Sequence, residues 1–519
     1  MKQDEKKIVI VGGGIAGLCA AVYAERCGYH AEVLEMHDMA GGLATSWRRG
    51  YYTFETCLHW LYGSNPSSPM HAQWMEVCDI DKLTFVNQQE LAHVETENGD
   101  SLGISTNVDR LETELLKRAP QDASAIRGLT SAIRRLGKFK MPDPGAGWAA
   151  NLQTLLHNIP CLPLLRELMR LSCREYAERF TDPLLKAAFA GGEMGKLSAI
   201  ALFFSLAWMD QHDAAYAVGG AQALIRLIEE ELASLGGRVR FATRVERILV
   251  ENDAAVGVQL AGGETIPADW VISAADGHAT IYELLGGKYT DKATKKTYDE
   301  MQTFPSYLQV SLGVAMDLAG QPVSVTRLLD APLHLDPATD VNQAAFRIFN
   351  FDPTFAPTGK TAITCFLPTR NSEYWVQLQQ NDPAGYRAEK DRIAGAVIAI
   401  LEKRIPELRQ AIEVIDVATP ATVIRYTGNW KGSMEGWFIS PGTRFRPLPN
   451  KLPRLRRFMM VGQWIMPGGG LPSGPMTARP ALQAICKQDG VPFTPRRKEA
   501  SKPDLTPASH PGTGTPVPL

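Results

Sequence analysis

The sequence predicts an α/β fold in which a domain built on a parallel sheet is interleaved with an α+β domain that carries a mostly helical insertion. Two observations lead to this prediction. A strand–helix–strand unit is expected between residues 8 and 35, because a β-branched run precedes a helix pattern rich in alanine and then a second strand. Helical periodicity dominates afterwards to about residue 208, and short β segments return after about residue 217.

The composition is that of a globular protein with several domains. At 519 residues the chain exceeds one ordinary core, so two or three domains are expected. Its hydrophobic fraction is 45%, and a net charge of -2 gives no general attraction to nucleic acid, so no DNA or RNA role is expected. The eight cysteines are dispersed without a CxxC pair, and no metal site is predicted.

The N-terminal residues leave no room for a signal peptide, because the strand pattern begins at Ile8, and a cytoplasmic location is therefore expected. The longest strongly apolar stretch, from about Ala199 to Trp208, is far shorter than the ~20 residues that cross a bilayer. Two interpretations of this stretch stay open. It rests on a membrane surface as a lipid entrance, or it is a core helix, since Phe203 and Phe204 lie in a run with no clear polar face.

The first strand–helix unit contains a glycine fingerprint in which each glycine has a mechanical role. Gly12 makes the tight turn, Gly14 lets the backbone approach a pyrophosphate, and Gly17 allows the helix and the strand to pack closely. The helix that follows presents free N–H groups and the positive end of its dipole to phosphates. The unit is therefore interpreted as a Rossmann-type dinucleotide site.

The second strand of this unit ends in an acid, Glu35, about twenty residues after the glycines. Its carboxylate would accept hydrogen bonds from the ribose hydroxyls, and it disfavours a 2′-phosphate, so NADP is a poor candidate. No second GxGxxG follows a strand elsewhere in the chain, and a separate NAD(P)H domain is not expected.

Further helices follow from capping and apolar spacing. Asn107 is placed to cap a helix through Leu111 and Leu115, and a second helix after about residue 122 is expected to end at Pro142 and Pro144. An amphipathic helix opens after a glycine pair at residues 219–220.

The C-terminal region repeats the physical logic of the N-terminal one. A strand at residues 458–464 leads to a glycine-rich turn at 467–474 and then to a helix expected from Ala478 to Lys487, whose N-terminus can stabilise negative charge. Beyond Pro492 the chain is rich in Pro, Thr and Ser with almost no large apolar residue, so it is predicted to be a disordered tail.

Several stretches together resemble the phytoene dehydrogenase and retinol saturase branch of the amine oxidase superfamily, through nearly the whole chain to about Asp489. They are Gly41–Gly42 with residues 43–46, then residues 216–220, 244–248, 269–274, 426–429 with Gly432 and Gly436, and 458–474. The resemblance implies an FAD-dependent enzyme with a Rossmann-type FAD-binding domain and an interleaved α+β substrate domain. It implies that residues 1–70, 215–300 and 455–491 form the FAD-binding domain, residues 71–214 and 301–454 the substrate domain, and residues 492–519 the tail.

The fingerprint and the resemblance together define the candidate cofactor site. Its residues are Gly12, Gly14, Ile15, Ala16, Gly17, Glu35, Met36, Gly41, Gly42, Leu43, Val245, Gly462, Gln463, Gly469 and Leu471. In the family the Val245 position lies against the adenine. Two positions depart from the family pattern, because many relatives carry Arg at position 43 and an acid at position 463. These departures concern the phosphate contacts and leave the FAD prediction unchanged.

One residue is a candidate for catalysis. His59 lies where relatives bring the chain under the isoalloxazine ring, so it could donate or accept a proton beside hydride transfer. The alternative is a histidine packed beside Trp60 and bonded to backbone. Cys57 is interpreted as a buried structural thiol rather than a nucleophile.

The resemblance implies an oxidoreductase that desaturates or saturates carbon–carbon bonds of a long apolar substrate, such as a carotenoid, a retinoid or another isoprenoid lipid, by hydride transfer with the flavin N5. The helical insertion between Tyr62 and Tyr216 would roof the substrate tunnel. Alternatives are redox-neutral isomerisation or hydration of unsaturated fatty acids, amine oxidation, and a flavin scaffold without activity. The expected partners are an apolar small molecule and, under one interpretation, a membrane surface. The sequence does not indicate the oligomeric state.

Overall fold

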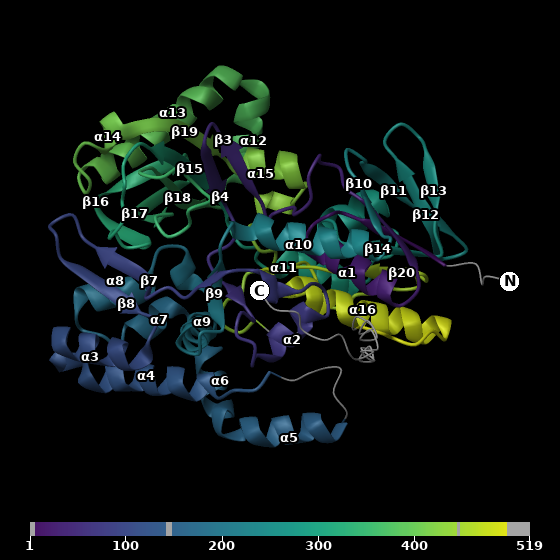
Figure 1. The fold of residues 1–519 in the computed structure, drawn as a ribbon, viewed down its shortest axis with the longest axis horizontal. Coiled ribbons are helices and arrows are strands. Elements are labelled where there is room, and N and C mark those ends of the chain that lie inside the picture. Colours follow the sequence, from purple (N-terminus) through teal and green to yellow (C-terminus); the bar gives the residue numbers. More distant parts are fainter. Residues whose placement is uncertain (1–5, 142–147, 444–446, 496–519) are drawn as a thin grey trace, which may run out of the picture.

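The computed structural model describes residues 6–141, 148–443 and 447–495. Its elements form two halves in Figure 1, with a helical layer beneath one of them. One half contains a five-stranded parallel sheet and helices α1, α10 and α16; the other contains a seven-stranded sheet. This arrangement confirms the predicted α/β class with a parallel sheet.

The parallel sheet is assembled from three distant parts of the sequence. Its strands, in spatial order, are β10 (Arg238–Arg240), β2 (His30–Leu34), β1 (Lys7–Val11), β14 (Trp270–Ser273) and β20 (Phe458–Met460). Side chains alternate across β1: Ile8 and Ile10 lie in one hydrophobic core, whereas Val9 and Val11 lie in another. Both faces of the sheet are therefore covered.

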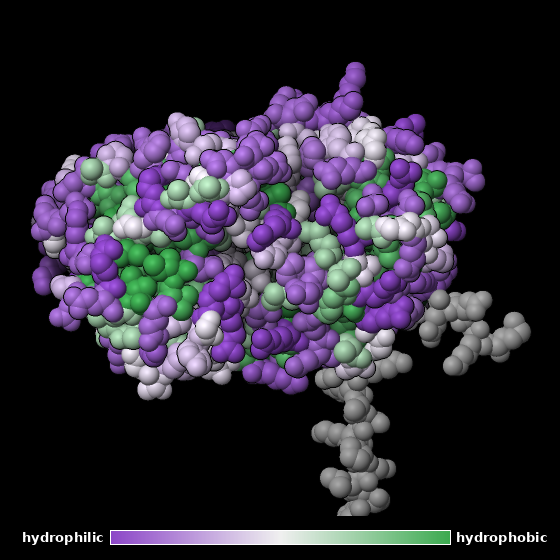
Figure 2. All heavy atoms as spheres, turned by 90° about the horizontal axis from the view of Figure 1, so that it is seen from above, coloured by the Kyte–Doolittle hydropathy of each residue, from purple (hydrophilic) through white to green (hydrophobic). Residues whose placement is uncertain are grey.

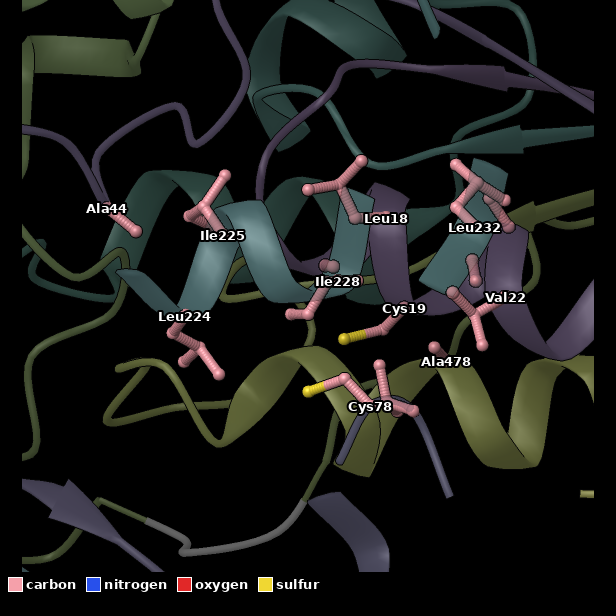
Figure 3. Packing of buried hydrophobic residues seen from close by; sticks show 14 of the residues in the cluster. Leu18, Cys19, Val22, Ala44, Cys78, Leu224, Ile225, Ile228, Leu232 and Ala478 are labelled. Atoms are coloured by element: carbon pink, nitrogen blue, oxygen red, sulfur yellow. The ribbon is translucent and has the colours of Figure 1, made fainter. Parts of the chain in front are cut away.

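Three helices cover the first face: α1 (Ile15–Arg26), α10 (Gly220–Ser234) and α16 (Ser473–Asp489). Figure 3 shows Leu18 and Val22 of α1 beside Ile228 of α10, with Ala478 of α16 packed below them. Small residues along α1 let the helices approach closely. Helix α16 begins at Ser473, before the expected start at Ala478. Proline is tolerated at the start of a helix, so Pro472 at the N-cap is compatible with this earlier start.

The second face carries a small antiparallel sheet of β11 (Val245–Glu251), β12 (Ala254–Leu260) and β13 (Thr265–Pro267). Its apolar side chains share a core with Val9, Val11 and Leu34. Val245 lies at the start of β11, and this packing holds it near the end of β2.

The seven-stranded sheet belongs to the other half of the molecule. Its spatial order is β19 (Ile412–Ala418), β15 (Ser306–Val314), β18 (Thr361–Thr369), β17 (Thr339–Ile348), β16 (Ser324–Asp336), β7 (Glu90–Glu95) and β8 (Ser101–Ser105). On one face, side chains such as Leu308, Val310 and Ile363 pack in a core with helix α13 (Pro383–Glu402). The alternate residues of the same strands face the opposite way.

A helical layer is formed by the insertion. Its helices are α3 (Val108–Arg118), α4 (Ala123–Gly137), α5 (Trp148–Asn158), α6 (Leu162–Leu168), α7 (Cys173–Ala177), α8 (Pro183–Ala190) and α9 (Ala199–Asp210). Asn107 caps α3 by accepting from the Arg110 N–H, as predicted. Helix α4 ends at Gly137, and the predicted stop signals Pro142 and Pro144 lie outside the described residues.

Helix α9 corrects the membrane interpretation of residues 199–208. Phe203 and Leu206 are fully buried, and Phe204 is half-buried with its ring 5.4 Å from that of Trp208. These side chains belong to the core shared with α3 and α4. The helix is apolar all round because it is surrounded by protein.

The remaining elements are short connections around these layers. They are β3 (Ser46–Arg49), β4 (Tyr52–Glu55), β5 (Leu61–Tyr62), β6 (Phe85–Val86), β9 (Ala214–Ala217), α2 (Pro69–Met75), α11 (Lys292–Glu300), α12 (Ser372–Asn381), α14 (Leu408–Ala411) and α15 (Pro420–Thr427), with one-turn 3₁₀ helices and a π-helical turn at Ala279–Leu284. The predicted domain boundary between residues 214 and 215 falls inside β9, which pairs with β5 and β6.

The start of the predicted tail is ordered against the first domain. The Phe493 ring lies 6.0 Å from that of Tyr23, and the Thr494 hydroxyl donates to the Arg26 carbonyl at 2.6 Å. The predicted tail therefore begins too early, because these contacts hold the residues after Pro492 on α1. Residues 496–519 lie outside the described residues. Figure 2 shows that the surface seen from above is mostly hydrophilic, with hydrophobic side chains in separate patches.

Candidate functional site

The turn after β1 is the starting point of the site. Gly12 has a φ of +100°, which favours glycine, and its N–H donates to the Leu34 carbonyl at 2.9 Å. A Cβ added at Gly17 would lie only 2.0 Å from the Gly12 carbonyl oxygen. Gly12 and Gly17 are therefore required by the fold itself, because they let the first turn of α1 rest on this turn.

Gly14 is different, because nothing in the protein requires a glycine there. Its φ is -70°, and an added Cβ would meet no protein atom closer than the Gly41 carbonyl oxygen at 3.8 Å. Gly14 is also the N-cap of α1, and no side chain caps that helix end. The N–H groups of the first turn, at Ile15 and Ala16, are available to an anion. This open approach fits the pyrophosphate of a bound dinucleotide.

The second glycine pair lies directly on the first loop. The Gly41 N–H donates to the Gly13 carbonyl at 2.9 Å, and a Cβ at Gly42 would lie 3.4 Å from the Gly14 Cα. Gly41 and Gly42 have φ values of +122° and +61°, and Leu43 follows them in a half-buried position. Two glycine-rich backbones thus meet where the predicted pyrophosphate would pass.

Glu35 is buried at the end of β2 and holds the same loop. One carboxylate oxygen accepts from the Gly13 N–H at 2.6 Å and the other from the His37 N–H at 2.9 Å. A carboxylate has about four acceptor sites, so both oxygens retain capacity for ribose hydroxyls. Met36 lies next to Arg244, and the Thr243 N–H donates to the Glu35 carbonyl at 2.8 Å. These contacts bring Val245 to the same end of the sheet.

The C-terminal motif closes the site from another side. A Cβ at Gly462 would lie 3.2 Å from the Ala16 Cβ, and one at Gly474 would lie 3.1 Å from Ile15. The N-terminal ends of α1 and α16 therefore lie together. Leu471 is buried in the core that contains α1. Gln463 is turned away from this contact, since its amide donates to the Asn429 side chain at 3.3 Å.

A buried acid that the sequence did not single out, Glu55, joins this site to the predicted catalytic segment. One of its oxygens accepts from the N–H groups of Thr56, Cys57 and Leu58, and the other accepts from the Ala221 N–H at 2.8 Å. Burial raises the pKa of Glu55. The neighbouring Gln222 amide donates to the Ala40 carbonyl, beside the second glycine pair.

The segment from Glu55 to His59 crosses the seven-stranded sheet on the face opposite its apolar core. Thr56 and Tyr307 share a hydroxyl hydrogen bond of 2.5 Å, and the Gln309 amide donates to the Glu55 carbonyl at 3.1 Å. The His59 ring lies 5.7 Å from that of Phe366 on the adjacent strand. The face that receives this segment is therefore the candidate substrate face.

His59 is a neutral imidazole at ordinary pH. Burial, together with the positive charge of Arg347, lowers its pKa to about 3. The protonated form is therefore absent near neutrality, and any role of His59 in proton transfer would be that of a neutral ring. The Cys57 thiol is also uncharged, because burial and the charges of Glu55 and Glu435 raise its pKa.

A second buried acid that the sequence did not single out, Glu435, lies near Cys57 and Gly469. A Cβ at Gly469 would lie 2.3 Å from the Glu435 carbonyl oxygen, so the two backbones are in contact. Burial raises the pKa of Glu435 to about 7, and no hydrogen bond to its side chain is found in the described ranges. Glu435 directly precedes Gly436, which belongs to a motif that the sequence did single out. This neighbouring motif is the signal that could have pointed to Glu435.

The structure thus brings the predicted cofactor residues together at the ends of β1 and β2, except that the side chain of Gln463 points toward Asn429. The glycine loops, Glu35 and the two helix N-termini form one end of the candidate site, and Cys57, His59 and Glu435 form the other. Within the described ranges no group of three or more His, Cys, Asp or Glu side chains could hold a metal ion. None of the helices in these ranges has the length and apolar character that a membrane span requires.

Comparison with known proteins identifies relatives of the whole chain. The family model "Flavin containing amine oxidoreductase" matches residues 15–387. The phytoene desaturase (neurosporene-forming) of Cereibacter sphaeroides is 25% identical over 494 residues, covering 90% of this chain and 92% of the relative. The chloroplastic prolycopene isomerase of Arabidopsis thaliana is 23% identical over 489 residues, covering 89% and 80% respectively.

Solved structures share the fold. An oxidoreductase from Methanosarcina mazei has a TM-score of 0.57 at 16% identity, covering 91% of this chain and 99% of that one. The cyclohexylamine oxidase from Brevibacterium oxydans has a TM-score of 0.59 at 14% identity, covering 94% and 100%. The match to the flavin family, together with this fold, supports FAD as the cofactor.

The space at Gly14 gives a direct test of the cofactor site. Gly14→Val should fold normally, because its backbone conformation suits any residue and no protein atom is crowded. It should nevertheless be purified without FAD, because the side chain enters the space that the pyrophosphate needs. The flavin absorption of the purified protein measures this. Gly128→Val, at an open helical position, is the control and should stay yellow. Stoichiometric FAD in folded Gly14→Val would contradict the assignment.

Proposed function

The chain belongs to the flavin-containing amine oxidoreductase family, and on this premise we propose that it desaturates or saturates carbon–carbon bonds of a long apolar substrate, such as a carotenoid, a retinoid or another isoprenoid lipid. The observation that carries the proposal is the likeness to carotenoid desaturases over about nine tenths of both chains. Such full-length matches include the substrate half of the molecule as well as the FAD-binding half.

The residues that would hold FAD follow from the geometry of the glycine loops. The pyrophosphate would lie at the N-terminus of α1, over Gly14 and beside the second glycine pair. Glu35 would bind the adenosine ribose, and Val245 would lie against the adenine. The N-terminus of α16, with Gly462, Gly469 and Leu471 before it, would face the flavin ring and stabilise negative charge on it.

Bound FAD supplies a two-electron centre that accepts or donates hydride at N5. The protein must then take up or supply the proton on the neighbouring carbon. Glu435 is the group best suited to this, because burial places its pKa at about 7 and its side chain is not tied to a structural partner in the described ranges. His59, with a pKa of about 3, would contribute packing and a neutral surface beside the ring.

A redox-neutral isomerase is the second candidate, because two of the relatives, matched over 72–80% of their own length and 83–89% of this chain, are prolycopene isomerases. This activity would use the same FAD site and the same apolar substrate class. Amine oxidation has weaker support, since the amine oxidases of similar fold are 13–14% identical to this chain, whereas the phytoene desaturases reach 24–25%.

The two candidates are separated by one experiment. The holoenzyme is mixed anaerobically with phytoene or with all-trans-retinol in detergent micelles, and flavin absorption and products are followed together. Bleaching of the oxidised flavin with formation of a new double bond, or reoxidation of chemically reduced flavin with loss of one, is expected. A geometric isomer without net redox change would favour the isomerase. Flavin reduction by amines but by no polyene would contradict both.

The proton role of Glu435 predicts a pH dependence with a definite sign. In the desaturating direction Glu435 must be charged to accept a proton, so the rate of the flavin half-reaction should rise with pH through about 7. In the saturating direction it must be protonated, so the rate should fall over the same range. Glu435→Gln should remove the dependence and slow the reaction by about 10²- to 10⁴-fold.

Asp276 provides a matched control for that profile. Burial raises its pKa to about 7 as well, but its oxygens accept from the N–H groups of Ala279 and Trp430, so its role is structural. Asp276→Asn should keep the pH profile of the wild type. A profile that survives in Glu435→Gln and is lost in Asp276→Asn would contradict the assignment.

We also propose that the enzyme rests on a membrane surface through helix α5. Six of the twelve exposed large apolar side chains of the described residues gather on α5, on the turn that leads into α6 and at the start of α6: Trp148, Leu152, Leu155, Leu156, Ile159 and Leu162. The leucines follow the spacing of one helical face. Exposed cations flank them at Lys138, Lys140, Arg166 and Arg170, which suits an anionic lipid surface. Figure 1 shows α5 at the lower edge of the helical layer, at the edge of the molecule.

The membrane proposal predicts that Leu155→Glu/Leu156→Glu releases the protein from vesicles. Each leucine inserted into the interface contributes about 1.5 to 3 kcal/mol, so two charges there should abolish flotation with phosphatidylcholine–phosphatidylglycerol vesicles. The melting temperature and the flavin spectrum should change little, because both side chains are more than half exposed. Phe203→Glu is the contrasting variant and should lower the melting temperature sharply. Wild-type protein that fails to float would contradict the proposal.

A further inference from the structure

Arg347 is a buried cation that has no ion-pair partner among the described residues. It lies on β17, and only 4% of the residue is exposed. Its Nη2 donates to the His59 carbonyl at 3.1 Å, and its Nε has no hydrogen-bond partner. Among the residues that the structure describes, no carboxylate forms an ion pair with it. Buried charges are normally paired, so this arrangement needs an explanation.

The adjacent strand shows how this fold treats an ordinary buried arginine. Arg327 on β16 is 7% exposed, and its Nη1 lies 3.0 Å from a Glu95 oxygen. Glu95 also pairs with Arg404 at 2.8 Å. Arg327 thus has a carboxylate partner supplied by the chain, whereas Arg347, one strand away in the same sheet, has none.

The side chains that surround the guanidinium of Arg347 are mainly aromatic, and Glu55 acts on its charge without forming an ion pair with it. Its guanidinium carbon lies 5.6 Å from the ring centres of Tyr216 and Phe351, and 5.9 Å from that of Phe349. Attraction between a cation and an aromatic ring is weaker than that of a buried ion pair, so these rings do not replace a carboxylate partner. Burial lowers the pKa of Arg347 to about 10, so the group remains charged at neutral pH.

A second unpartnered polar group lies directly beside it. Thr364 on β18 is opposite Arg347 in the register, and its buried Oγ1 has no hydrogen-bond partner. Opposite residues in an antiparallel pair have Cβ atoms about 5 Å apart on the same face of the sheet. This face is the one crossed by residues 55–59, and Gln309, which holds that segment, also leaves Oε1 unpartnered.

We propose that Arg347 and Thr364 bind the carboxylate of the substrate, so that the enzyme acts on a long apolar acid rather than on a pure hydrocarbon. The inference rests on the proposed function, because it places the head group of an apolar chain on the substrate face beside His59. A carboxylate supplies the negative charge that Arg347 lacks, and it has enough acceptor sites for both the guanidinium and the threonine hydroxyl.

The test compares three probes with one carbon skeleton: retinoic acid, methyl retinoate and retinol. Each is titrated into the holoenzyme at mildly alkaline pH, where acid and arginine are both charged, and flavin fluorescence reports binding. The wild type should bind the acid at least tenfold more tightly than the ester or the alcohol. Arg347→Met should bind all three alike, and Arg347→Lys should keep part of the preference, because it keeps the charge but loses the planar fork.

Arg327→Met is the control, since it removes an equally buried arginine from the neighbouring strand and leaves Glu95 paired with Arg404. It should lower stability and keep the preference for the acid. Equal binding of all three probes by the wild type, or an acid preference that survives in Arg347→Met with its FAD retained, would overturn the inference. In the first case the redox function can still hold, whereas tight acid binding without any flavin reaction or product would support the site and overturn the proposed function.

Discussion

The contact between Gly17 and the carbonyl of Gly12 is the constraint on which the rest of the site depends. A single added carbon at Gly17 would lie 2.0 Å from that oxygen. Only this close approach lets α1 begin directly at the carboxyl edge of β1, with its free N–H groups at the end of the sheet. Gly41 and the start of α16 are then placed against that helix end.

Buried hydrogen bonds connect the glycine loops to the other half of the molecule. Gln222, next to the second glycine pair, lies on α10 beside Ala221, whose N–H donates to Glu55. Glu55 in turn orders residues 56–58 against the seven-stranded sheet. A Cβ at Gly220 would lie 2.2 Å from a Glu55 oxygen, so the glycine pair before α10 is needed for this junction. The relative position of the candidate cofactor end and the candidate substrate face thus depends on the few groups around Glu55.

Much of the parallel sheet and of its loop could be predicted from sequence, because these features are local. The turn glycines, the acid ending β2 and the Asn107 cap are each readable within a few residues. The role of Glu55 could not be predicted, because the donor that joins it to α10, the Ala221 N–H, lies 166 residues away in the sequence. The apolar run of α9 was ambiguous for a similar reason, because its burial depends on packing against α3 and α4. The exposure of the α5 leucines likewise depends on the tertiary structure, and their sequence pattern alone does not indicate it.

The buried charges around the site form a graded series. Glu55 is fully satisfied by backbone N–H groups and fixes the fold. Arg347 has one carbonyl and three aromatic rings, and Glu435 has no side-chain partner in the described ranges. Each buried charged group without a full set of partners lowers the free energy of unfolding. An apolar residue at the same position would be less destabilising, so stability alone does not explain these residues. The number of hydrogen-bond partners therefore falls from Glu55 to Arg347 and Glu435, the two groups for which we propose substrate binding and proton transfer, as expected where function rather than packing determines the residue.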